Sequence, residues 1–235
     1  MLEQIKEDVC VAMEKDPSAR NFLEVFVCYP GVHALIIYRI THRLWKADFK
    51  FLARLISFFS RWMTGVEIHP AAKIGHRFFI DHGMGVVIGE TSEVGDNVFI
   101  YHGVTLGGLS MKKGKRHPTI GNDVVIGAGA QVLGPVNVGN NTKIGSGSVV
   151  VQDVPEYSTV IGVPGRVVFS GVSSDYEDND AALPDPMARA IECMLERLPK
   201  MELEIRQLKE DLRAQSPSEE ADPPLEKASG QDENP

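Results

Sequence analysis

An aliphatic residue recurs every six positions through the middle of the chain. The positions are Ile120, Ile126, Val132, Val138, Ile144 and Val150, and a glycine directly follows most of them. A period of six matches neither one face of a helix nor the two-residue alternation of a simple strand. We therefore interpret the segment as a solenoid in which each hexad forms one short side of a coil.

The same spacing continues upstream with two interruptions. One series is Ile68, Ile74, Ile80 and Val86, and the next is Ile88, Val94, Ile100 and Leu106. The slip between residues 86 and 88 predicts a small insertion. The step of fourteen from Leu106 to Ile120 leaves eight extra residues around Gly108 to His117, which must leave the coil as a loop, where function often sits. With three hexads per coil, residues 66 to 168 predict roughly five coils.

Helical spacing dominates the N-terminal part. Residues 2 to 15 predict a helix, and Asp16-Pro17-Ser18 either ends it or provides Asp16 as the cap of the next helix. Further helices are predicted at 31 to 46 and 49 to 63. The last has Leu52, Leu55, Phe59 and Trp62 on one face, and although a basic amphipathic helix can lie on a membrane, we favour packing of this face against the coil.

The C-terminal part shows a different period. Its apolar residues alternate steps of three and four, which is a heptad seam of Ile191, Met194, Leu198, Met201, Ile205, Leu208 and Leu212. A lone amphipathic helix that folds back is the alternative. We predict an α+β chain with a helical domain (1–64), a parallel β-helix (65–170), a linker (171–185), a heptad helix (186–214) that is possibly a trimeric coiled coil, and a disordered acidic tail (215–235).

Charge and cysteine content narrow the function classes. The net charge is −8, but residues 171 to 235 hold 17 acidic and 7 basic residues, so residues 1 to 170 carry +2 and no basic footprint for nucleic acid. The apolar stretch at 26 to 38 is too short to span a membrane, and we expect no membrane partner. Three cysteines without paired spacing predict reduced thiols in a cytoplasmic protein.

Three stretches place titratable groups on the ladder: EIHPAAKIG at 67 to 75, IDHGMGVVIGE at 80 to 90, and GVTLGG with GKRHPTIG at 103 to 121. The motifs DHGMGVVIGET, YHGVTLGG and KRHPTIG, in this order, resemble the serine O-acetyltransferase branch of the hexapeptide-repeat acyltransferases, over roughly residues 5 to 168. The resemblance implies a left-handed coil. It also implies transfer of the acetyl group from acetyl-CoA to the hydroxyl of L-serine, the first step of cysteine biosynthesis, with no metal.

Acetyl transfer to a hydroxyl needs a base, because an unassisted alcohol is a poor nucleophile near neutral pH. A neutral imidazole suits this task, and His82 is the candidate. A carboxylate that holds the second ring nitrogen would fix the tautomer. Glu67 lies fifteen residues earlier, close to one coil of about eighteen, so we expect it on the adjacent rung beside His82. In the family this position is often Asp.

The resemblance also implies the substrate contacts. His117 matches a second active-site histidine that helps hold the substrate, and Arg116 would pair with the amino-acid carboxylate. Asp16 matches an aspartate that binds the substrate ammonium, and Asp81 lies in the same pocket. Cysteine is implied as a feedback inhibitor in that pocket. We interpret the remaining histidines as structural: His33, His42, His69, His76 and His102.

Coenzyme A is expected along the outside, between neighbouring coils. Small residues allow close approach there, and the candidates are Gly107, Gly108, Ala128 and Gly145, with Lys143 as a point charge for a phosphate. Tight corners of the coil explain these glycines equally well.

Three other functions compete with this one. Relatives of the same repeat family acetylate sugars or another small hydroxyl acceptor such as homoserine, but the paired IDHG and KRHP motifs fit them less well. A zinc carbonic anhydrase on the same solenoid would need three converging histidines, with His76, His82, His102 and His117 as candidates. A scaffolding protein would explain the heptad tail alone.

Flat-sided prisms favour a homotrimer that places the loop of Arg116 and His117 against a neighbouring chain. The family's hexamers use a long N-terminal region, most of which has no counterpart before Asp16, so we expect a single trimer. The family's partner lyase grips a C-terminal isoleucine. This chain ends in Pro235, so we do not expect that complex.

Overall fold

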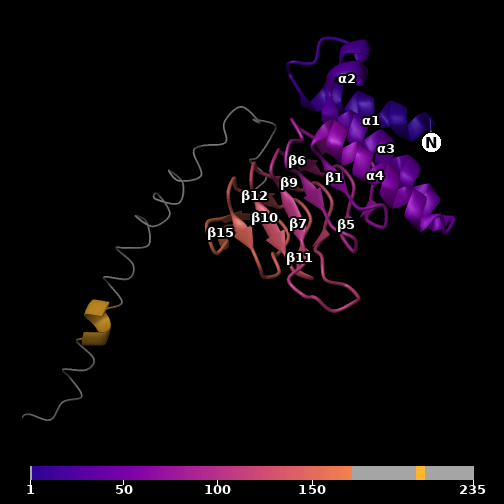
Figure 1. The fold of residues 1–235 in the computed structure, drawn as a ribbon. Helices are drawn as coiled ribbons and strands as arrows, with labels where there is room; N and C mark the ends of the chain where they lie inside the picture. Colours follow the sequence, from indigo (N-terminus) through magenta and orange to yellow (C-terminus); the bar gives the residue numbers. More distant parts are fainter. Residues whose placement is uncertain (1, 171–204, 210–235) are drawn as a thin grey trace, which may run out of the picture. The chain divides into compact units, whose positions relative to one another are not determined.

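The computed structural model describes residues 2–170 and 205–209 (Figure 1). The chain divides into two compact units, residues 1–186 and residues 187–235. In the second unit the described residues, 205–209, are helical. The predicted linker, most of the heptad seam, the acidic tail and Pro235 lie outside the described residues.

Four helices precede the coil: α1 (Leu2–Lys15), α2 (Phe22–Cys28), α3 (Pro30–Lys46) and α4 (Lys50–Thr64). The predicted helices at 2 to 15, 31 to 46 and 49 to 63 are confirmed, whereas the seven-residue α2 was not predicted. The alternative that Asp16 caps the next helix is wrong. The Asn21 side chain accepts from Glu24 N at the start of α2, and Asp16 Oδ1 accepts from Ser18 N in the turn after α1.

The strands fall in turn on three parallel sheets, so each coil has three sides. The first sheet contains β1 (Glu67–Ile68), β4 (Val87–Ile88), β7 (Thr105–Gly107), β10 (Gln131–Leu133) and β13 (Val149–Val150). The second contains β2 (Lys73–Ile74), β5 (Glu93–Val94), β8 (Thr119–Ile120) and β11 (Asn137–Val138). The third contains β3 (Phe79–Ile80), β6 (Phe99–Ile100), β9 (Val125–Ile126), β12 (Lys143–Ile144) and β14 (Ser158–Ile161), and β15 (Arg166–Ser170) closes it antiparallel to β14.

Strand register gives the length of each coil. Glu67 pairs with Val87, a step of 20 residues, and Val87 pairs with Thr105, a step of 18. Thr105 pairs with Gln131, a step of 26, and Gln131 with Val149, again 18. The two-residue slip and the eight-residue loop are therefore both confirmed, and the five strands of the first sheet match the five expected coils. The left-handed sense of the coil stays a prediction.

The inward aliphatic residues form one continuous core. All fourteen hexad positions named above from Ile68 to Val150 are buried, and Ile88, Ile100, Leu106, Ile126 and Val132 are fully so. Leu35 and Tyr38 of α3 belong to the same cluster, so this helix packs directly on the coil. Burial of these side chains is the main source of stability for the fold.

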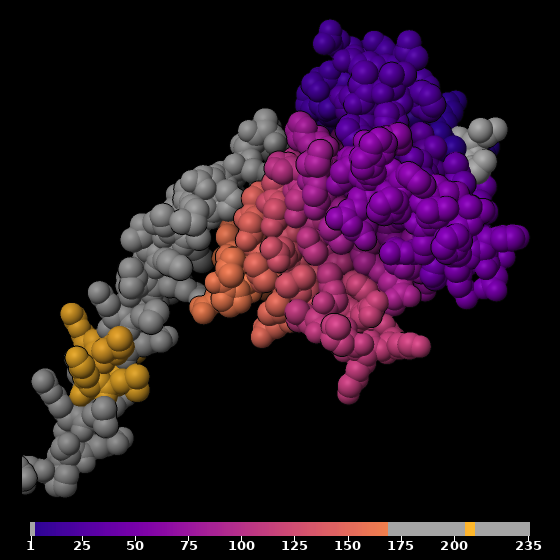
Figure 2. Space-filling view, in the orientation of Figure 1, coloured from indigo at the N-terminus to yellow at the C-terminus, as the bar shows by residue number. Residues whose placement is uncertain are grey.

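A buried cation ties the helices to the second rung. Arg39 of α3 donates to the carbonyl oxygens of Ile74 and Gly75, both at 2.8 Å, and its guanidinium lies 3.4 Å from Asp8 of α1. Both side chains are buried. The helices consequently cover the N-terminal end of the coil, as the indigo and violet segments of Figures 1 and 2 show.

The contact face of α4 differs from the expected one. Its buried residues are small: Ala53, Ser57, Ser60 and Thr64. The predicted apolar face is exposed, including Leu52, Leu55, Phe59 and Trp62, with Trp62 83% exposed. The expectation that this face packs against the coil within the chain is therefore wrong. Small side chains bring the helix close to the coil, where the Ser57 hydroxyl donates to Ile68 O at 2.8 Å.

Within the described residues, no single helix has the length and apolar character needed to cross a membrane. The pair α2 and α3 meets those two criteria jointly, but the two helices are bent by 73° where they meet.

Candidate active site

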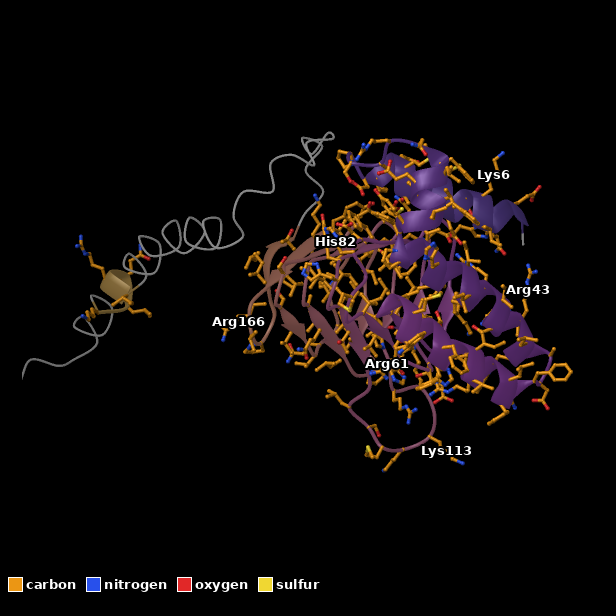
Figure 3. All side chains as sticks on the ribbon, turned by 45° about the horizontal axis from the view of Figure 1, so that its top comes forward. Lys6, Arg43, Arg61, His82, Lys113 and Arg166 are labelled. Carbon is orange, nitrogen blue, oxygen red and sulfur yellow. The ribbon has the colours of Figure 1, made fainter. Side chains whose placement is uncertain are left out.

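His82 lies on a corner of the prism between the third and first sheets. The corner segments of this edge are residues 81–86, 101–104, 127–130 and 145–148, which connect the strands of these two sheets on successive rungs; we call it the His82 edge. His82 has φ 58°, in the left-handed region that non-glycine residues rarely adopt. Such a backbone often marks a functional position. The side chain is 75% exposed and projects from the coil (Figure 3).

Two carboxylates face the His82 ring. Asp81 Oδ2 lies 3.8 Å from His82 Nε2. Burial raises the pKa of Asp81, while the neighbouring His82 opposes that rise. Burial would also raise the pKa of Asp16, but hydrogen bonds from Tyr29 and Ser18 outweigh it and, with His82 nearby, lower the pKa. The structure thus brings together three of the predicted residues, Asp16, Asp81 and His82.

Glu67 has a different partner from the one expected. Its carboxylate forms an ion pair with Arg61 of α4, with Oε2 2.8 Å from the guanidinium nitrogen. Among the residues that the structure describes, no hydrogen bond or ion pair joins Glu67 to His82. The carboxylate within 4 Å of the His82 ring is instead that of Asp81.

His102 was interpreted as structural, yet its ring lies at the same site. The His82 and His102 ring centroids are 6.0 Å apart, and the rings are edge to face at 74°. The available signal was the spacing of 20 residues, which equals the register step that pairs Phe79 with Phe99. Tyr29, the hydrogen-bond donor to Asp16, was also missed, because nothing in its local sequence points toward the coil.

The corner between the first and second sheets carries His117; we call it the His117 edge. The Thr91 hydroxyl accepts from the backbone N–H groups of Arg116 and His117, at 3.1 and 3.2 Å. Its proton is therefore free to point at His117 Nδ1, 2.8 Å away, and Thr91 N also donates to this nitrogen at 3.2 Å. Nδ1 is thus an acceptor, and neutral His117 carries its proton on Nε2.

The charge state of His117 follows from its surroundings. Burial lowers the pKa of His117, and the adjacent Arg116 cation lowers it further. Arg116 forms an ion pair with Glu90 at 2.7 Å. Gly108 lies next to both, since a Cβ there would be 3.1 Å from Arg116 O and 3.3 Å from His117 Nε2. An open depression of about 410 Å³ adjoins this edge, lined by residues that include Trp45, Glu90 and Lys115.

The predicted residues therefore divide into two groups on one chain. Ala128 and Gly145 share the His82 edge, and Lys143 lies on β12, which leads into that edge. Gly107, Gly108, Arg116 and His117 share the His117 edge. A whole side of the prism separates the two edges, roughly 15 Å at about 3.3 Å per residue of strand. One chain alone does not bring His82 and His117 together.

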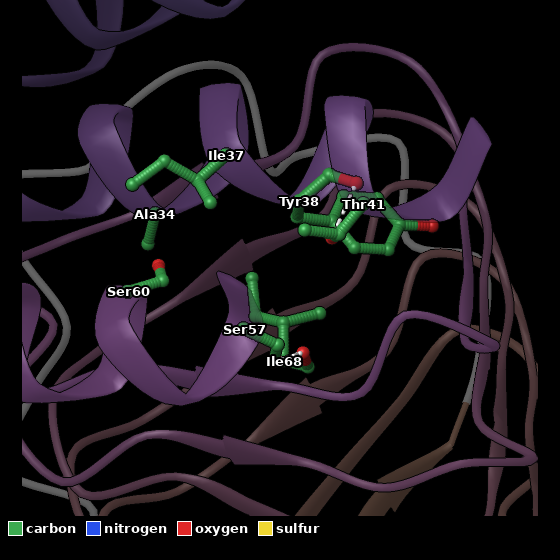
Figure 4. A pocket seen from close by; sticks show the side chains of 7 residues that line it. All are labelled: Ala34, Ile37, Tyr38, Thr41, Ser57, Ser60 and Ile68. Atoms are coloured by element: carbon green, nitrogen blue, oxygen red, sulfur yellow. Dashed lines mark hydrogen bonds between the residues drawn. The ribbon is translucent and has the colours of Figure 1, made fainter. Parts of the chain in front are cut away.

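Neither a metal centre nor a buried pocket competes with these edges. The described part of the chain contains no group of three His, Cys, Asp or Glu side chains that could hold a metal ion. A cavity of about 10 Å³ lies between α3, α4 and β1, where Tyr38, Thr41 and Ser57 are among the lining residues (Figure 4). It has room for about one water molecule and is too small for a substrate.

Comparison with known proteins identifies relatives over nearly the whole chain. Residues 117–152 match the family model described as bacterial transferase hexapeptide (six repeats). A serine acetyltransferase of Bacillus licheniformis is 53% identical over 219 residues, which cover 93% of this chain and 98% of the relative. That of Synechococcus elongatus is 50% identical over 203 residues, covering 86% of this chain and 83% of the relative.

Solved structures give the same result. The serine acetyltransferase of Neisseria gonorrhoeae in complex with serine has a TM-score of 0.68 and 43% identity, covering 70% of this chain and 68% of that one. The enzyme of Brucella abortus in complex with coenzyme A has a TM-score of 0.70 and 40% identity, covering 73% and 69%. A serine acetyltransferase in complex with cysteine has a TM-score of 0.69 and 42% identity, covering 73% and 70%.

Proposed function

The chain belongs to the serine acetyltransferases, and we propose that His82 is the general base of its reaction. The reaction moves the acetyl group of acetyl-CoA to the hydroxyl of L-serine and serves cysteine biosynthesis. The observation that supports the assignment is the cluster of His82 with Asp81 and Asp16 on an exposed corner of the coil. This arrangement offers a base, a counter-charge and an ammonium site within one small region.

The proposed chemistry uses each of these side chains. Neutral His82 removes the hydroxyl proton of serine as the oxygen attacks the thioester carbon, and it returns that proton to the sulfur that leaves. Asp81, 3.8 Å away, stabilises the imidazolium present between the two transfers. Asp16 accepts the serine ammonium. Glu67, expected in the orienting role, is held by Arg61, so we assign the electrostatic support to Asp81.

Residues of both edges fit a coenzyme A that lies along the coil. Gly107 and Gly108 offer an open backbone on one edge, and Ala128 and Gly145 on the other. Lys143 on β12 would place a positive charge for a phosphate. We propose these five as the contacts.

A neighbouring chain would complete the site, and we propose a homotrimer for this reason. His117 and Arg116 of one chain would meet His82 of the next, because the two edges of one chain are a prism side apart. The exposed apolar face of α4, with Phe51 81% and Trp62 83% exposed, fits a surface that contacts another copy. A coiled coil of the 186–214 segment would add to this assembly.

Subunit mixing tests the shared site. His82→Ala and His117→Ala chains are each expected to be nearly inactive. Refolded together at equal amounts, they should regain roughly a quarter of wild-type activity, the fraction of interfaces that combine an intact His82 with an intact His117. If both histidines served from one chain, mixing would restore nothing.

The base assignment is tested by thiol release from acetyl-CoA with serine, homoserine or a galactoside as acceptor. We expect strong turnover with serine alone, since Asp16 and Arg116 together suit an amino acid. His82→Ala should lose nearly all of it. His76→Ala is the matched control, because His76 is exposed and paired with Glu7 away from the His82 edge. Full activity of His82→Ala would exclude His82 as the base.

Regulation and location remain proposals of the same kind. A relative binds cysteine, so we propose that cysteine competes for the serine site, and a rate unchanged by added cysteine would contradict this. Cys10 and Cys28 are unpaired and exposed, which supports a reducing, cytoplasmic setting. Alkylation of both thiols in freshly lysed cells would test that point.

A further inference from the structure

The Asp16 carboxylate is held by a different donor at each oxygen. Ser18 N donates to Oδ1 at 2.7 Å, within the turn that follows α1. The Tyr29 hydroxyl donates to Oδ2 at 2.5 Å, from a residue thirteen positions away. Each carboxylate oxygen has a second acceptor position, so both remain able to bind an ammonium group. The turn fixes one oxygen locally, and Tyr29 alone determines how the carboxylate plane is rotated.

Tyr29 itself is rigidly placed. It is the single residue between α2 and α3, where the chain bends by 73°. Its N–H donates to Val25 O at 3.3 Å, and its carbonyl oxygen accepts from His33 N at 3.1 Å. The ring packs against the small helical core that includes Val25 and Val32. The hydroxyl therefore reaches Asp16 from a well-anchored ring.

The hydrogen bond also has an electrostatic effect. A bond from a phenol to a carboxylate is charge-assisted and stronger than a neutral one. Burial by itself would raise the pKa of Asp16, and the Tyr29 bond counters this effect most among the neighbouring groups. The same contact raises the pKa of Tyr29 together with burial, so the phenol keeps the proton that it donates.

From this geometry we infer that Tyr29 is a positioning residue, which aims the Asp16 carboxylate at the amino group of the acceptor beside His82. The inference rests on the proposed function and extends it, because it assigns recognition of the amino group to a pair of residues rather than to Asp16 alone. It acts through Asp16 and involves no contact with the reacting atoms.

Tyr29→Phe removes only the hydroxyl and keeps the packed ring. We expect the KM for serine to rise about five- to twentyfold, with kcat within about twofold of wild type, because the lost contact serves ground state and transition state alike. The KM for acetyl-CoA should not change. Tyr157→Phe is the matched control, since Tyr157 is an exposed tyrosine in the turn before β14 and should keep the wild-type KM.

An acceptor analogue without the amino group separates aiming from general damage. 3-Hydroxypropanoate is serine without its amino group, and we expect its inhibition constant to be equal in wild type and Tyr29→Phe. A merely structural role of Tyr29 would weaken serine and the analogue together. Asp16→Asn should abolish the effect of Tyr29→Phe, because the hydroxyl would no longer have a charge to aim.

The outcomes keep the two proposals apart. A wild-type protein that does not acetylate serine would overturn the proposed function. A wild-type protein that does, with a Tyr29→Phe variant whose serine KM stays within about twofold or whose affinities for serine and the analogue fall equally, would overturn the role of Tyr29 alone.

Discussion

Gly89 gives the most direct test of the His117 half-site. The residue follows β4, and its N–H donates to Leu106 O at 3.1 Å, so its backbone is fixed by the rung above. The ring of His117 lies flat against its Cα. A Cβ at position 89 would be 2.0 Å from His117 Cδ2 and 2.1 Å from Nε2, far inside van der Waals contact. Gly89→Ala must therefore move the ring.

The size of the effect follows from these distances. Relieving the overlap needs a shift of about 1.5 Å, given carbon contacts near 3.5 to 4.0 Å. A shift of that size breaks the 2.8 Å contact between the Thr91 hydroxyl and His117 Nδ1. Misplacement by about 1 Å costs on the order of 100-fold in rate, so we expect kcat/KM for serine to fall about 100-fold. The ring can turn outward into solvent, so the melting temperature should change little.

The assay is thiol release from acetyl-CoA at limiting serine, with thermal unfolding measured on the same samples. A double-mutant cycle with His117→Ala identifies the cause: if Gly89→Ala acts by displacing this ring, the double variant should be no slower than His117→Ala alone. The reasoning is refuted if Gly89→Ala stays within about threefold of wild type, or if the two losses multiply.

Three further predictions concern stability. Arg39→Leu should cost about 3 to 5 kcal/mol in urea unfolding, because it strands the buried Asp8 carboxylate, and a loss below about 1 kcal/mol would contradict this. Ile126→Ala should cost about 2 to 5 kcal/mol, against less than about 0.5 for the exposed Val163→Ala. Burial, with Arg54 nearby, lowers the pKa of His69 to about 4. The folded state thus resists its protonation, so stability falls as pH drops from about 6.5 toward 4, and His69→Gln should flatten that fall in unfolding midpoints across this range.

Much of the fold was accessible from the sequence, because a period of six has one simple physical solution. Each short side buries one aliphatic residue, and departures from the period must leave the coil, so the coils of 20 and 26 residues were countable in advance. Helix α2 was not, since its seven residues are mostly apolar yet exposed. The face of α4 was misjudged because an apolar stripe indicates burial without saying which chain provides it.

The site was predictable as a set of residues and less so as a geometry. Glu67 was paired with His82 by assuming a coil of about eighteen residues. The first coil has 20, and Glu67 lies beneath Val87, five positions beyond His82, where Arg61 takes its charge. The separation of His82 from His117 depends on which corner each occupies, and the aim of Asp16 depends on a tyrosine from a different helix pair. Motif order carries neither kind of information.

Both histidines sit where the repeat is irregular. The two surplus residues of the first coil fall in the corner 81–86 that presents His82, and the eight surplus residues end at His117. An idealised chain with uniform hexads would bury the same aliphatic ladder and stack just as well, but it would lack the wide corner and the long excursion. Evolution of this scaffold toward perfect regularity would thus yield a sturdy, inert rod, and chemistry survives only where counting by six fails.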